Sequence, residues 1–177
     1  MKKSNFTNEQ IKDVIKNLEP PKGRMEVLSF LRGKIVIDYA HTPDAVQQIL
    51  LTAREIPHQK IYTIVGCGGD RDPLKRPIMG EIATSLSDFV IFTSDNPRTE
   101  DPFHILKDIT ADLQKNNFTV IENRKDAINK GVQMMKKNDI LLVLGKGHEN
   151  YQIIGNTKFD FDDKIVVETK IREICKE

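Results

Sequence analysis

The sequence predicts an α/β fold of three layers, in which a mostly parallel sheet is covered by helices on both faces and is followed by a C-terminal hairpin. Three observations support it. From about residue 40 onward, β-rich runs alternate with helical patterns. Two of these runs, "KIYTIVGC" and "DILLVLG", are almost continuously apolar, which is typical of parallel strands buried on both faces. The 177 residues suffice for one well-buried core, so one domain is expected over 1–177.

The first predicted elements are a helix and two short strands. Residues 7–19 begin with a threonine cap and have the apolar spacing of a one-sided helix, at Ile11, Val14, Ile15 and Leu18. After "PPKG", the runs 24–30 and 34–40 read as strands. The connection "LRG" suits a hairpin-like turn between them.

The rest of the chain alternates between helices and strands. The helix over 42–56 begins with a threonine cap and has Pro43 in its first turn, as helix starts often do. Further helices are predicted over 73–87, 101–114 and 124–137, and strands over 60–67, 88–94, 118–123 and 139–145. The tail 151–161 reads as a hairpin turning at "GN", and a closing helix starts from Asp162.

Composition excludes several classes of protein. Lys and Arg number 27 against 26 Asp and Glu, without a long block of one sign, so a nucleic-acid or anionic-membrane partner is not expected. Cys67 and Cys175 lie far apart without metal-ligand spacing, which argues against structural zinc and against a disulfide framework. The start "MKKSNFTNEQ" lacks the apolar segment of a signal peptide, and no apolar stretch is long enough to cross a bilayer. A cytoplasmic location is expected.

The predicted architecture indicates where a ligand site lies. In open parallel α/β sheets, ligands bind outside the carboxyl ends of the strands, in the loops that lead to the next element. These loops are all polar, and three of them are rich in charge or glycine: "DYAHTPD", "GCGGDRDPLKRP", "SDNPRTEDP" and "GKGHENYQ". Because they follow the most apolar segments of the chain, they are expected to gather on one edge of the sheet.

The segment "SDNPRTEDP" has two interpretations. Asn-Pro and Asp-Pro are ordinary turn formers, and Thr99 or Asp101 suits the cap of the next helix, so a purely structural turn is one of them. Arg98 favours the other, because a turn has no need of a guanidinium, whereas a ligand carboxylate is held well by its rigid fork of donors.

The other loops carry weaker signals. The "GCGGDRD" loop allows close backbone approach and adds Arg71, but it is not the GxGxxG dinucleotide pattern. The "GKGHE" segment lacks the spacing and the Ser or Thr of a P-loop. His41 and His148 sit in loops and are candidate ligand contacts, whereas His58 and His104 read as surface residues. No nucleophilic constellation stands out.

Five segments of the chain resemble one known family. They are "GRMEVL", "IDYAHTPDA", "VGCGGDRDPLKRPIMG", "TSDNPRTEDP" and "LGKGHENYQ". In this order and at these separations they closely resemble the Rossmann-like C-terminal domain of the Mur ligases, and among these the MurE type, which adds meso-2,6-diaminopimelate to UDP-MurNAc-L-Ala-D-Glu in peptidoglycan precursor synthesis. The resemblance runs from about Gly23 to the closing helix.

The resemblance implies a role within a larger enzyme. Mur ligases have a UDP-sugar domain, a central P-loop ATPase domain and this C-terminal domain, which brings in the amino acid. ATP phosphorylates the substrate carboxylate, and the amine attacks the resulting acyl phosphate as the domain closes. The implied cofactors are ATP and Mg, with the Mg ligands in the central domain, and the implied partners are meso-diaminopimelate, ATP and, through the other domains, UDP-MurNAc-dipeptide.

The resemblance also implies site residues. The "DNPR" motif, Asp95, Asn96, Pro97 and Arg98, accompanies meso-diaminopimelate, with Asn96 and Arg98 expected at its distal carboxylate and amine end. Arg71, Gly145 and Glu149 are expected to complete this pocket. On the nucleotide side the resemblance implies Arg24 toward phosphate, and the loop from Asp38 to His41 toward ribose and base. No catalytic residue and no metal ligand is expected in this chain.

The chemistry of the ligand agrees with this assignment. Diaminopimelate is lysine with a carboxylate added beside its distal amine, so a selective site needs a cation for that carboxylate and an anion or carbonyl for the amine. Arg98 and Glu149 fit these roles. Because lysine would leave Arg98 unpaired in the pocket, discrimination is expected to come from the buried unpaired charge.

Two alternatives stay open. The chain has no P-loop, and the resemblance places the carbamylated lysine in the central domain, so the polypeptide alone is not expected to ligate. It is either the end of a longer ligase, with 1–22 as interdomain helix and hinge, or a stand-alone non-catalytic module that binds an amino acid. A nucleotide-binding protein of unrelated chemistry is disfavoured because no dinucleotide fingerprint opens the first helix.

Overall fold

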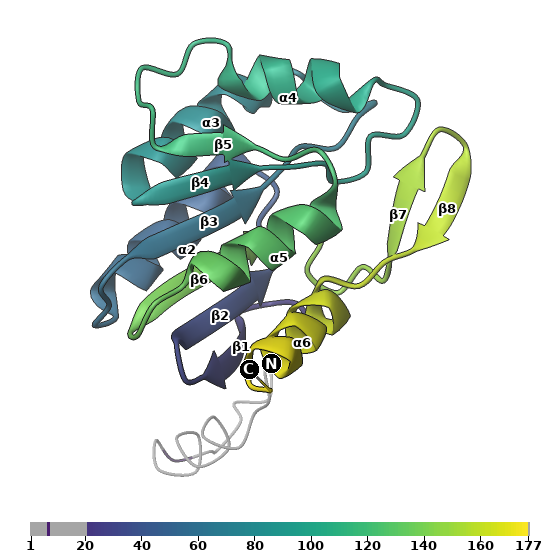
Figure 1. The fold of residues 1–177 in the computed structure, drawn as a ribbon. Helices are drawn as coiled ribbons and strands as arrows, with labels where there is room; N and C mark the ends of the chain where they lie inside the picture. The colour runs from purple at the N-terminus through teal and green to yellow at the C-terminus, as the bar shows by residue number, and fades with distance from the viewer. Residues whose placement is uncertain (1–6, 8–20, 177) are drawn as a thin grey trace.

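The computed structural model describes Thr7 and residues 21–176. The helix predicted over 7–19 and the hinge predicted over 1–22 therefore lie outside the described residues, except for Thr7 and positions 21 and 22. The described part forms a six-stranded sheet with helices on both faces, and a separate two-stranded sheet projects from it (Figure 1). The predicted three-layer α/β class is confirmed.

The described elements follow the predicted order. The strands are β1 (Glu26–Phe30), β2 (Gly33–Asp38), β3 (Ile61–Val65), β4 (Phe89–Phe92), β5 (Phe118–Val120), β6 (Asp139–Leu144), β7 (Tyr151–Ile154) and β8 (Thr157–Asp160). The helices are α2 (Pro43–Glu55), α3 (Lys75–Leu86), α4 (Pro102–Thr110), α5 (Arg124–Met134) and α6 (Asp163–Ile174). Helix α4 ends four residues before its predicted end, in a turn in which the Leu113 amide donates to the Thr110 carbonyl.

The main sheet has the order β1-β2-β6-β3-β4-β5. Only β1 runs antiparallel to its neighbour, as the predicted hairpin requires, and the remaining adjacent strands are parallel. Strand β6 is last in sequence among these six, yet it lies between β2 and β3. The connections that follow β2 and β3 lead to one face of the sheet, and the one that follows β6 leads to the other, which creates the crevice where α/β proteins bind ligands.

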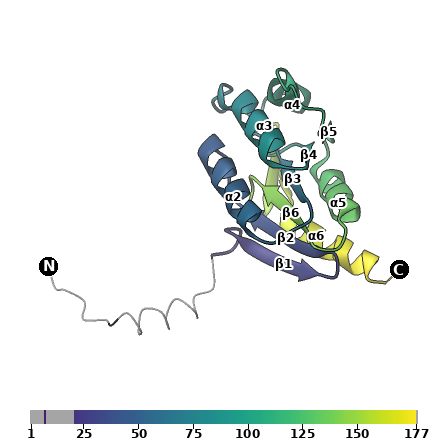
Figure 2. The same ribbon diagram turned by 90° about the vertical axis from the view of Figure 1, so that its left-hand side faces the viewer.

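Two apolar clusters hold the layers together. One packs α2, α3 and α4 on one face of the sheet, and the other packs α5 and α6 on the opposite face (Figure 2). Strand β6 is buried throughout because Leu142 points into the first cluster and Leu141 into the second. Full burial of such a side chain contributes about 1.5–3 kcal/mol, so the continuous apolar run of this strand stabilises both layers at once.

Helix starts are set by local hydrogen bonds. The Thr42 and Asp101 side chains cap α2 and α4, and a proline follows each in the first turn. The Asp162 carboxylate accepts from the amides of Lys164 and Ile165 and so starts α6, as predicted. Caps of this kind contribute about 1 kcal/mol each and here fix where each loop ends.

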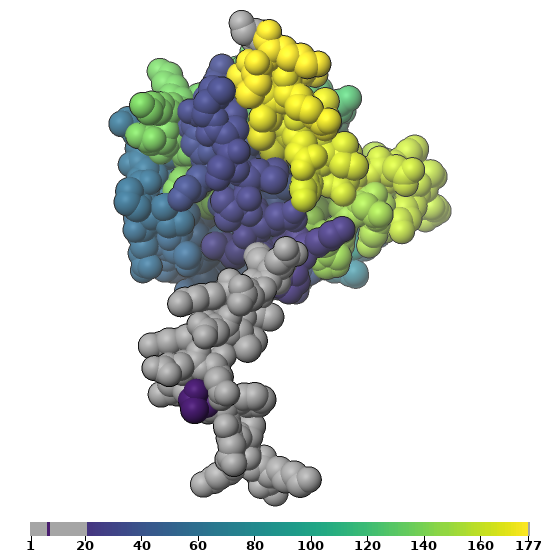
Figure 3. All heavy atoms as spheres, turned by 90° about the horizontal axis from the view of Figure 1, so that it is seen from below, coloured from purple at the N-terminus to yellow at the C-terminus, as the bar shows by residue number. Residues whose placement is uncertain are grey.

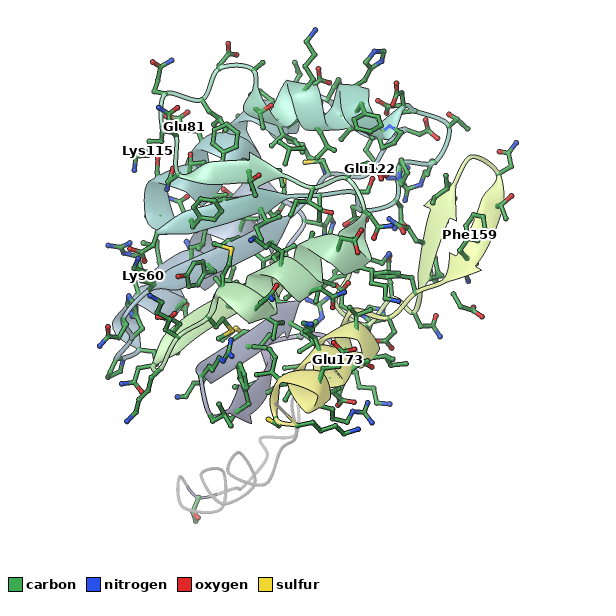
Figure 4. The ribbon with its side chains drawn as sticks, viewed as in Figure 1. Lys60, Glu81, Lys115, Glu122, Phe159 and Glu173 are labelled. Carbon is green, nitrogen blue, oxygen red and sulfur yellow. The ribbon has the colours of Figure 1, made fainter. Side chains whose placement is uncertain are left out.

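The polar loops lie on one edge of the sheet. Glu122 follows β5 on the side that faces the hairpin, whereas Lys60 and Lys115, which precede strands, lie on the opposite side (Figure 4). The loops after β2, β3, β4 and β6 therefore share the carboxyl edge, as predicted.

The hairpin and the last helix complete this edge. Strands β7 and β8 turn at Gly155 and Asn156, as predicted, and the hairpin carries the exposed side chain of Phe159 away from the main sheet (Figure 4). Helix α6 returns alongside the first strands, as the view from below shows (Figure 3). An ion pair of 2.6 Å joins Lys164 of α6 to Glu26 of β1.

Candidate functional site

A cavity of about 270 Å³ opens at the carboxyl edge of the sheet. Four loops, those after β2, β3, β4 and β6, line it with Tyr39, His41, Thr42, Gly68, Arg71, Lys75, Asp95, Asn96, Arg98, Gly145 and Glu149. Six of the seven residues predicted for the amino acid are therefore together. The seventh, Pro97, is buried beside the cavity rather than on its wall.

A second cavity, of about 670 Å³, lies between α5 and α6. It is lined by Lys125, Asn129, Ile165 and their neighbours, and it contains none of the residues predicted to bind a ligand. The smaller cavity is the candidate site because it combines several cations and carboxylates at the carboxyl ends of the parallel strands, where α/β sheets bind ligands.

The centre of the site is a buried hydrogen-bond network around Asn96. The Asn96 Nδ2 donates to Glu149 Oε2 at 2.8 Å, and its Oδ1 accepts from Lys146 Nζ at 3.2 Å and from the Ile153 amide at 2.9 Å. Lys146 Nζ also lies 3.1 Å from Glu149 Oε2. Three chain segments are thus joined, and the amide of Asn96 has one orientation that satisfies all its partners.

Arg98 is held in a strained backbone conformation. Its φ of 53° lies in the left-handed region, which costs a non-glycine residue of the order of 1–3 kcal/mol. Two backbone hydrogen bonds to the hairpin stabilise it: its amide donates to the Ile153 carbonyl at 3.0 Å, and its carbonyl accepts from the Gly155 amide at 2.6 Å. The guanidinium donates through Nη1 to the Gly69 carbonyl at 2.7 Å, which positions the remaining donors at the cavity.

Asp95 forms the floor of the cavity. Its side chain is buried, and among residues 21–176 no group donates a hydrogen bond to its carboxylate. Burial raises the pKa of Asp95 above its ordinary value, and the nearby charges of Arg124 and Lys146 oppose that shift.

A fully buried ion pair lies beneath this floor. The Arg124 guanidinium donates through Nε and Nη2 to the Asp163 carboxylate at 2.8 and 2.7 Å. Its Nη2 also donates to the carbonyl of Leu144, and Nη1 to that of Ser94. One side chain therefore ties the starts of α5 and α6 to the ends of β4 and β6. Burial acts to lower the pKa of Arg124, but the charge and hydrogen bonds of Asp163, together with the charge of Asp95, outweigh it and raise that pKa above its ordinary value.

The loop after β3 packs closely against the loop after β4 and is hydrogen-bonded to it. A Cβ added at Gly69 would lie 1.9 Å from the Pro97 carbonyl oxygen, so only glycine allows this approach. The predicted close backbone approach is thus made to a neighbouring loop. At the rim, Thr99 donates to Asp70 at 2.7 Å, and Arg76 holds Glu100 with two contacts of 2.8 Å.

The residues predicted for the nucleotide lie in or next to the loop after β2. The Asp38 carboxylate accepts from the amides of Met25 and Ala40 at 2.8 and 2.7 Å, so it holds two loop segments in place. Arg24 lies over the Tyr39 ring, 5.5 Å from its centroid, and His41 packs against the same ring at 4.6 Å. Of the three predicted nucleotide residues only His41 also lines the cavity.

Several residues with a place in the site were missed from the sequence, among them Lys75, which lines the cavity at the start of α3. Lys146 is fully buried and pairs with two predicted ligand residues. Tyr39 lies between Arg24, His41 and His148. The signal for Lys146 was a lysine between two glycines, directly after the most apolar strand, where burial is expected. Tyr39 had no signal beyond its place in the loop.

Other expectations concern groups away from the cavity. The imidazole of His58 donates through Nδ1 to the Ile56 carbonyl at 2.6 Å and is half-buried, whereas His104 is exposed on α4. Within the described part of the chain, no three His, Cys, Asp or Glu side chains gather as a metal site would need. Nor does any helix among the described residues have the length and apolarity to span a membrane.

The sequence matches a known family over most of its length. Residues 23–147 match the family described as Mur ligase, glutamate ligase domain. A UDP-N-acetylmuramoyl-L-alanyl-D-glutamate--2,6-diaminopimelate ligase from Clostridium acetobutylicum is 46% identical over 169 residues, and one from Clostridioides difficile is 49% identical over 147. The first alignment covers 94% of this chain and 35% of the relative, and the second covers 81% and 30%. The chain thus spans about a third of the length of these curated relatives.

Solved structures agree with the sequence match. The structure of a ligase with the same name has a TM-score of 0.84 at 38% identity and covers 96% of this chain, which in turn covers 35% of that protein. A Mycobacterium tuberculosis folylpolyglutamate synthase, solved with ADP and AMPPCP, has a TM-score of 0.60 at 18% identity, over 80% of this chain and 33% of the synthase. The second likeness bears on the fold alone.

Proposed function

Because this chain belongs to the Mur ligase family and has the sequence of its C-terminal domain, we propose that it recruits meso-2,6-diaminopimelate for a MurE-type ligase. In that role the domain holds the amino acid so that its free amine attacks the activated carboxylate of UDP-MurNAc-L-Ala-D-Glu. The domain contributes to the rate by orienting the amine, because two groups that are held next to each other react faster than two that must first meet in solution. The step belongs to cytoplasmic peptidoglycan precursor synthesis.

One observation carries the proposal. The cavity brings cations and carboxylates together from loops that are far apart in sequence, such as those of Arg71 and Glu149. Arg98 lies in the same cavity as Glu149 and Asp95. A free amino-acid end has one carboxylate and one ammonium group side by side, so it needs a cation and an anion side by side. This cavity offers that combination.

The residues divide between the two charges of the ligand. Arg98 receives the distal carboxylate through its unused donors, and Asn96 adds an amide N–H. Glu149 and Asp95 receive the distal ammonium. Arg71, which is exposed at the rim, adds a second cation for a carboxylate, and Gly145 lines the cavity with Pro97 buried beside it.

Selectivity against lysine follows from the same charges. Lysine lacks the distal carboxylate, so it would cover Arg98 without pairing it. A buried charge left without a partner is costly, and hydrogen bonds to charged groups contribute about 1.5–3 kcal/mol each. The site therefore rejects lysine by leaving Arg98 unpaired rather than by steric exclusion.

The nucleotide side of the proposal rests on Arg24, Asp38 and His41. Arg24 is exposed and offers a guanidinium to phosphate, and the exposed ring of His41 is available to the ribose or base. Asp38 acts on the shape of the loop, because its carboxylate is already engaged by two backbone amides. ATP with Mg supplies the phosphoryl group that activates the acceptor carboxylate, and we place the metal ligands in the rest of the enzyme.

Calorimetric titration of this chain with meso-diaminopimelate tests the proposal, with L-lysine as the matched ligand. We expect binding of diaminopimelate and little binding of lysine. Arg98→Ala is expected to weaken diaminopimelate binding by about 10- to 100-fold, the loss of one charged hydrogen-bonding group.

Arg54→Ala is the matched control, since Arg54 is an exposed arginine at the end of α2 that donates to the Leu86 carbonyl. It should bind as the unaltered chain does. Equal binding of the two amino acids, or an Arg98→Ala variant that binds diaminopimelate normally, would refute the pocket assignment. If neither amino acid binds, this chain does not recruit the amino acid by itself.

A further inference from the structure

We propose that Lys146 is a positioning residue for the amino-acid site, which acts by fixing the orientation of Asn96 and Glu149. The inference rests on the proposed function, because it assigns the ordering of that same pocket. Lys146 lies beneath the pocket wall and is absent from the residues that line the cavity. It therefore acts on the ligand through its neighbours.

Burial and contacts set Lys146 apart from the other lysines. Its side chain is fully buried, and its ammonium group is 3.1 Å from Glu149 Oε2 and 3.2 Å from Asn96 Oδ1. The Tyr151 ring lies on a further side, with its centroid 5.4 Å from Nζ. A buried ammonium is costly unless it is paired, and here each hydrogen-bond partner is a residue assigned to the ligand.

The contact with Asn96 decides which end of its amide faces the pocket. Asn96 Oδ1 accepts from two donors, Lys146 Nζ and the Ile153 amide, so Nδ2 points toward Glu149. If the amide were reversed, its NH₂ group would face two donors and lose both bonds. Lys146 thus keeps an N–H donor on the pocket side of Asn96.

The contact with Glu149 decides which oxygen stays available. Lys146 Nζ and Asn96 Nδ2 both donate to Glu149 Oε2. Neither of these two hydrogen bonds involves Oε1, so that oxygen stays available to a ligand. The carboxylate is thereby held in one rotamer before any ligand binds. A site whose groups are held in advance binds more tightly, because the ligand does not have to order them.

A purely structural role is the competing explanation. A buried ion pair can often be replaced by apolar side chains without loss of stability, so fold stability alone does not call for a lysine at this position. The two explanations differ in their consequence for Asn96. A structural lysine affects the unfolding midpoint, whereas a positioning lysine affects the order of the Asn96 amide and the affinity for ligand.

The test uses Lys146→Met, which keeps the length of the side chain and removes its charge and donors. Lys170→Met is the matched control, because Lys170 forms an ion pair with Glu173 at the same i,i+3 spacing on α6. Two quantities are measured for each: the NMR signals of the Asn96 side-chain amide without ligand, and the dissociation constants for meso-diaminopimelate and L-lysine. Thermal unfolding confirms that each variant folds.

We expect Lys146→Met to broaden or shift the Asn96 amide signals and to weaken diaminopimelate binding by about tenfold or more, with the control unchanged in both. The inference is overturned if either quantity stays at its unaltered value. If Lys146→Met does not fold, Lys146→Leu, which also lacks the charge and the donors, is judged by the same two criteria.

The outcomes separate this inference from the proposed function. If the unaltered chain binds no diaminopimelate, the proposed function fails for this chain, and the amide signals alone decide whether Lys146 orders Asn96. If the unaltered chain binds diaminopimelate and Lys146→Met binds it equally well, the proposed function stands and the inference is wrong.

Discussion

The floor and the rim of the cavity each contain an aspartate in a neighbouring loop, and the two carboxyl groups differ in almost every respect. Asp95, on the floor, is buried, and burial raises its pKa. Asp70, on the rim, is exposed, and hydrogen bonds from Thr99 lower its pKa. The floor is built from desolvated charges that depend on one another, and the rim from hydrogen bonds in contact with water.

This difference indicates how the site divides its tasks. Buried charges interact strongly and are costly to leave unpaired, so the floor sets both the stability of the carboxyl edge and the strength of a ligand contact. Exposed contacts are screened by solvent and contribute little, so the rim mainly places Arg71 and Arg98. Changes on the floor are therefore expected to have the larger effects.

Arg124→Met is expected to have the largest effect, because it leaves Asp163 buried without its counterion and removes the donors to the Ser94 and Leu144 carbonyls. Breaking one partner of a buried pair costs about 3–5 kcal/mol. Urea unfolding of the variant and of the unaltered chain measures the loss.

The double variant Arg124→Met with Asp163→Leu is the control. Removing both charges should recover a large part of the stability, because the penalty of an unpaired buried charge then disappears. A single variant within about 0.5 kcal/mol of the unaltered chain, the usual range for surface substitutions, would show that the floor does not depend on this pair.

Asp95→Asn is expected to raise stability and to weaken ligand binding. The pKa of Asp95 is higher in the folded chain than in the unfolded chain. The carboxyl group therefore contributes its full stability below the unfolded pKa, and this stability is lost as the pH rises through the folded pKa. At neutral pH the desolvation of the Asp95 carboxyl group therefore costs folding free energy, and a neutral amide should relieve that cost.

The measurement is the unfolding midpoint of Asp95→Asn and of the unaltered chain between about pH 3 and pH 7, the range that spans ordinary aspartate titration. The advantage of the variant should be greatest near pH 7 and shrink toward low pH. The same variant should bind meso-diaminopimelate more weakly, because an amide does not attract an ammonium group as a carboxylate does. If the difference in unfolding midpoint between Asp95→Asn and the unaltered chain grew toward low pH, a raised pKa of Asp95 would not be its cause.

Thr99→Val is expected to have the smallest effect and to act on the rim alone. Thr99 donates through its hydroxyl to Asp70 Oδ1 at 2.7 Å, and this hydrogen bond is the largest cause of the lowered pKa of Asp70. Its loss should move the pKa of Asp70 upward, toward the ordinary value, as measured by NMR titration of the carboxyl carbon.

The stability contributed by Asp70 depends on pH in the opposite direction to that contributed by Asp95. A lowered pKa contributes stability above the unfolded pKa and loses it as the pH falls, so the Thr99→Val variant should differ from the unaltered chain only above the acidic range. Since Asp70 is exposed, the midpoint at pH 7 should change little. A large drop there would place the rim among the elements that hold the fold.

Local patterns were sufficient for most of the fold. The apolar runs of β3 and β6 marked central strands, because a strand covered on both faces is apolar at nearly every position. Threonine or aspartate before proline marked the starts of α2 and α4, because side-chain caps act within one turn. Helix ends were less certain: α5 stops three residues before its predicted end, near Asn138, whose φ is 66°.

The loops that form the site could be predicted from the sequence, but the hydrogen bonds and ion pairs between their side chains could not. The parallel order placed Arg71, Asn96, Arg98 and Glu149 on the same edge, since carboxyl ends of parallel strands meet there. The sequence by itself thus determined the fold class, the edge that carries the site and the charges available on it. These depend on periodicity and on short-range capping, which neighbouring residues decide.

Only the tertiary structure decided how those charges pair. That Lys146 is buried against Asn96, that Arg124 spans the ends of β4 and β6, and that Asp38 is engaged by backbone amides all depend on segments that are distant in sequence. Pairing depends on distance and on exclusion of water, and both are set when the sheet places β6 between β2 and β3.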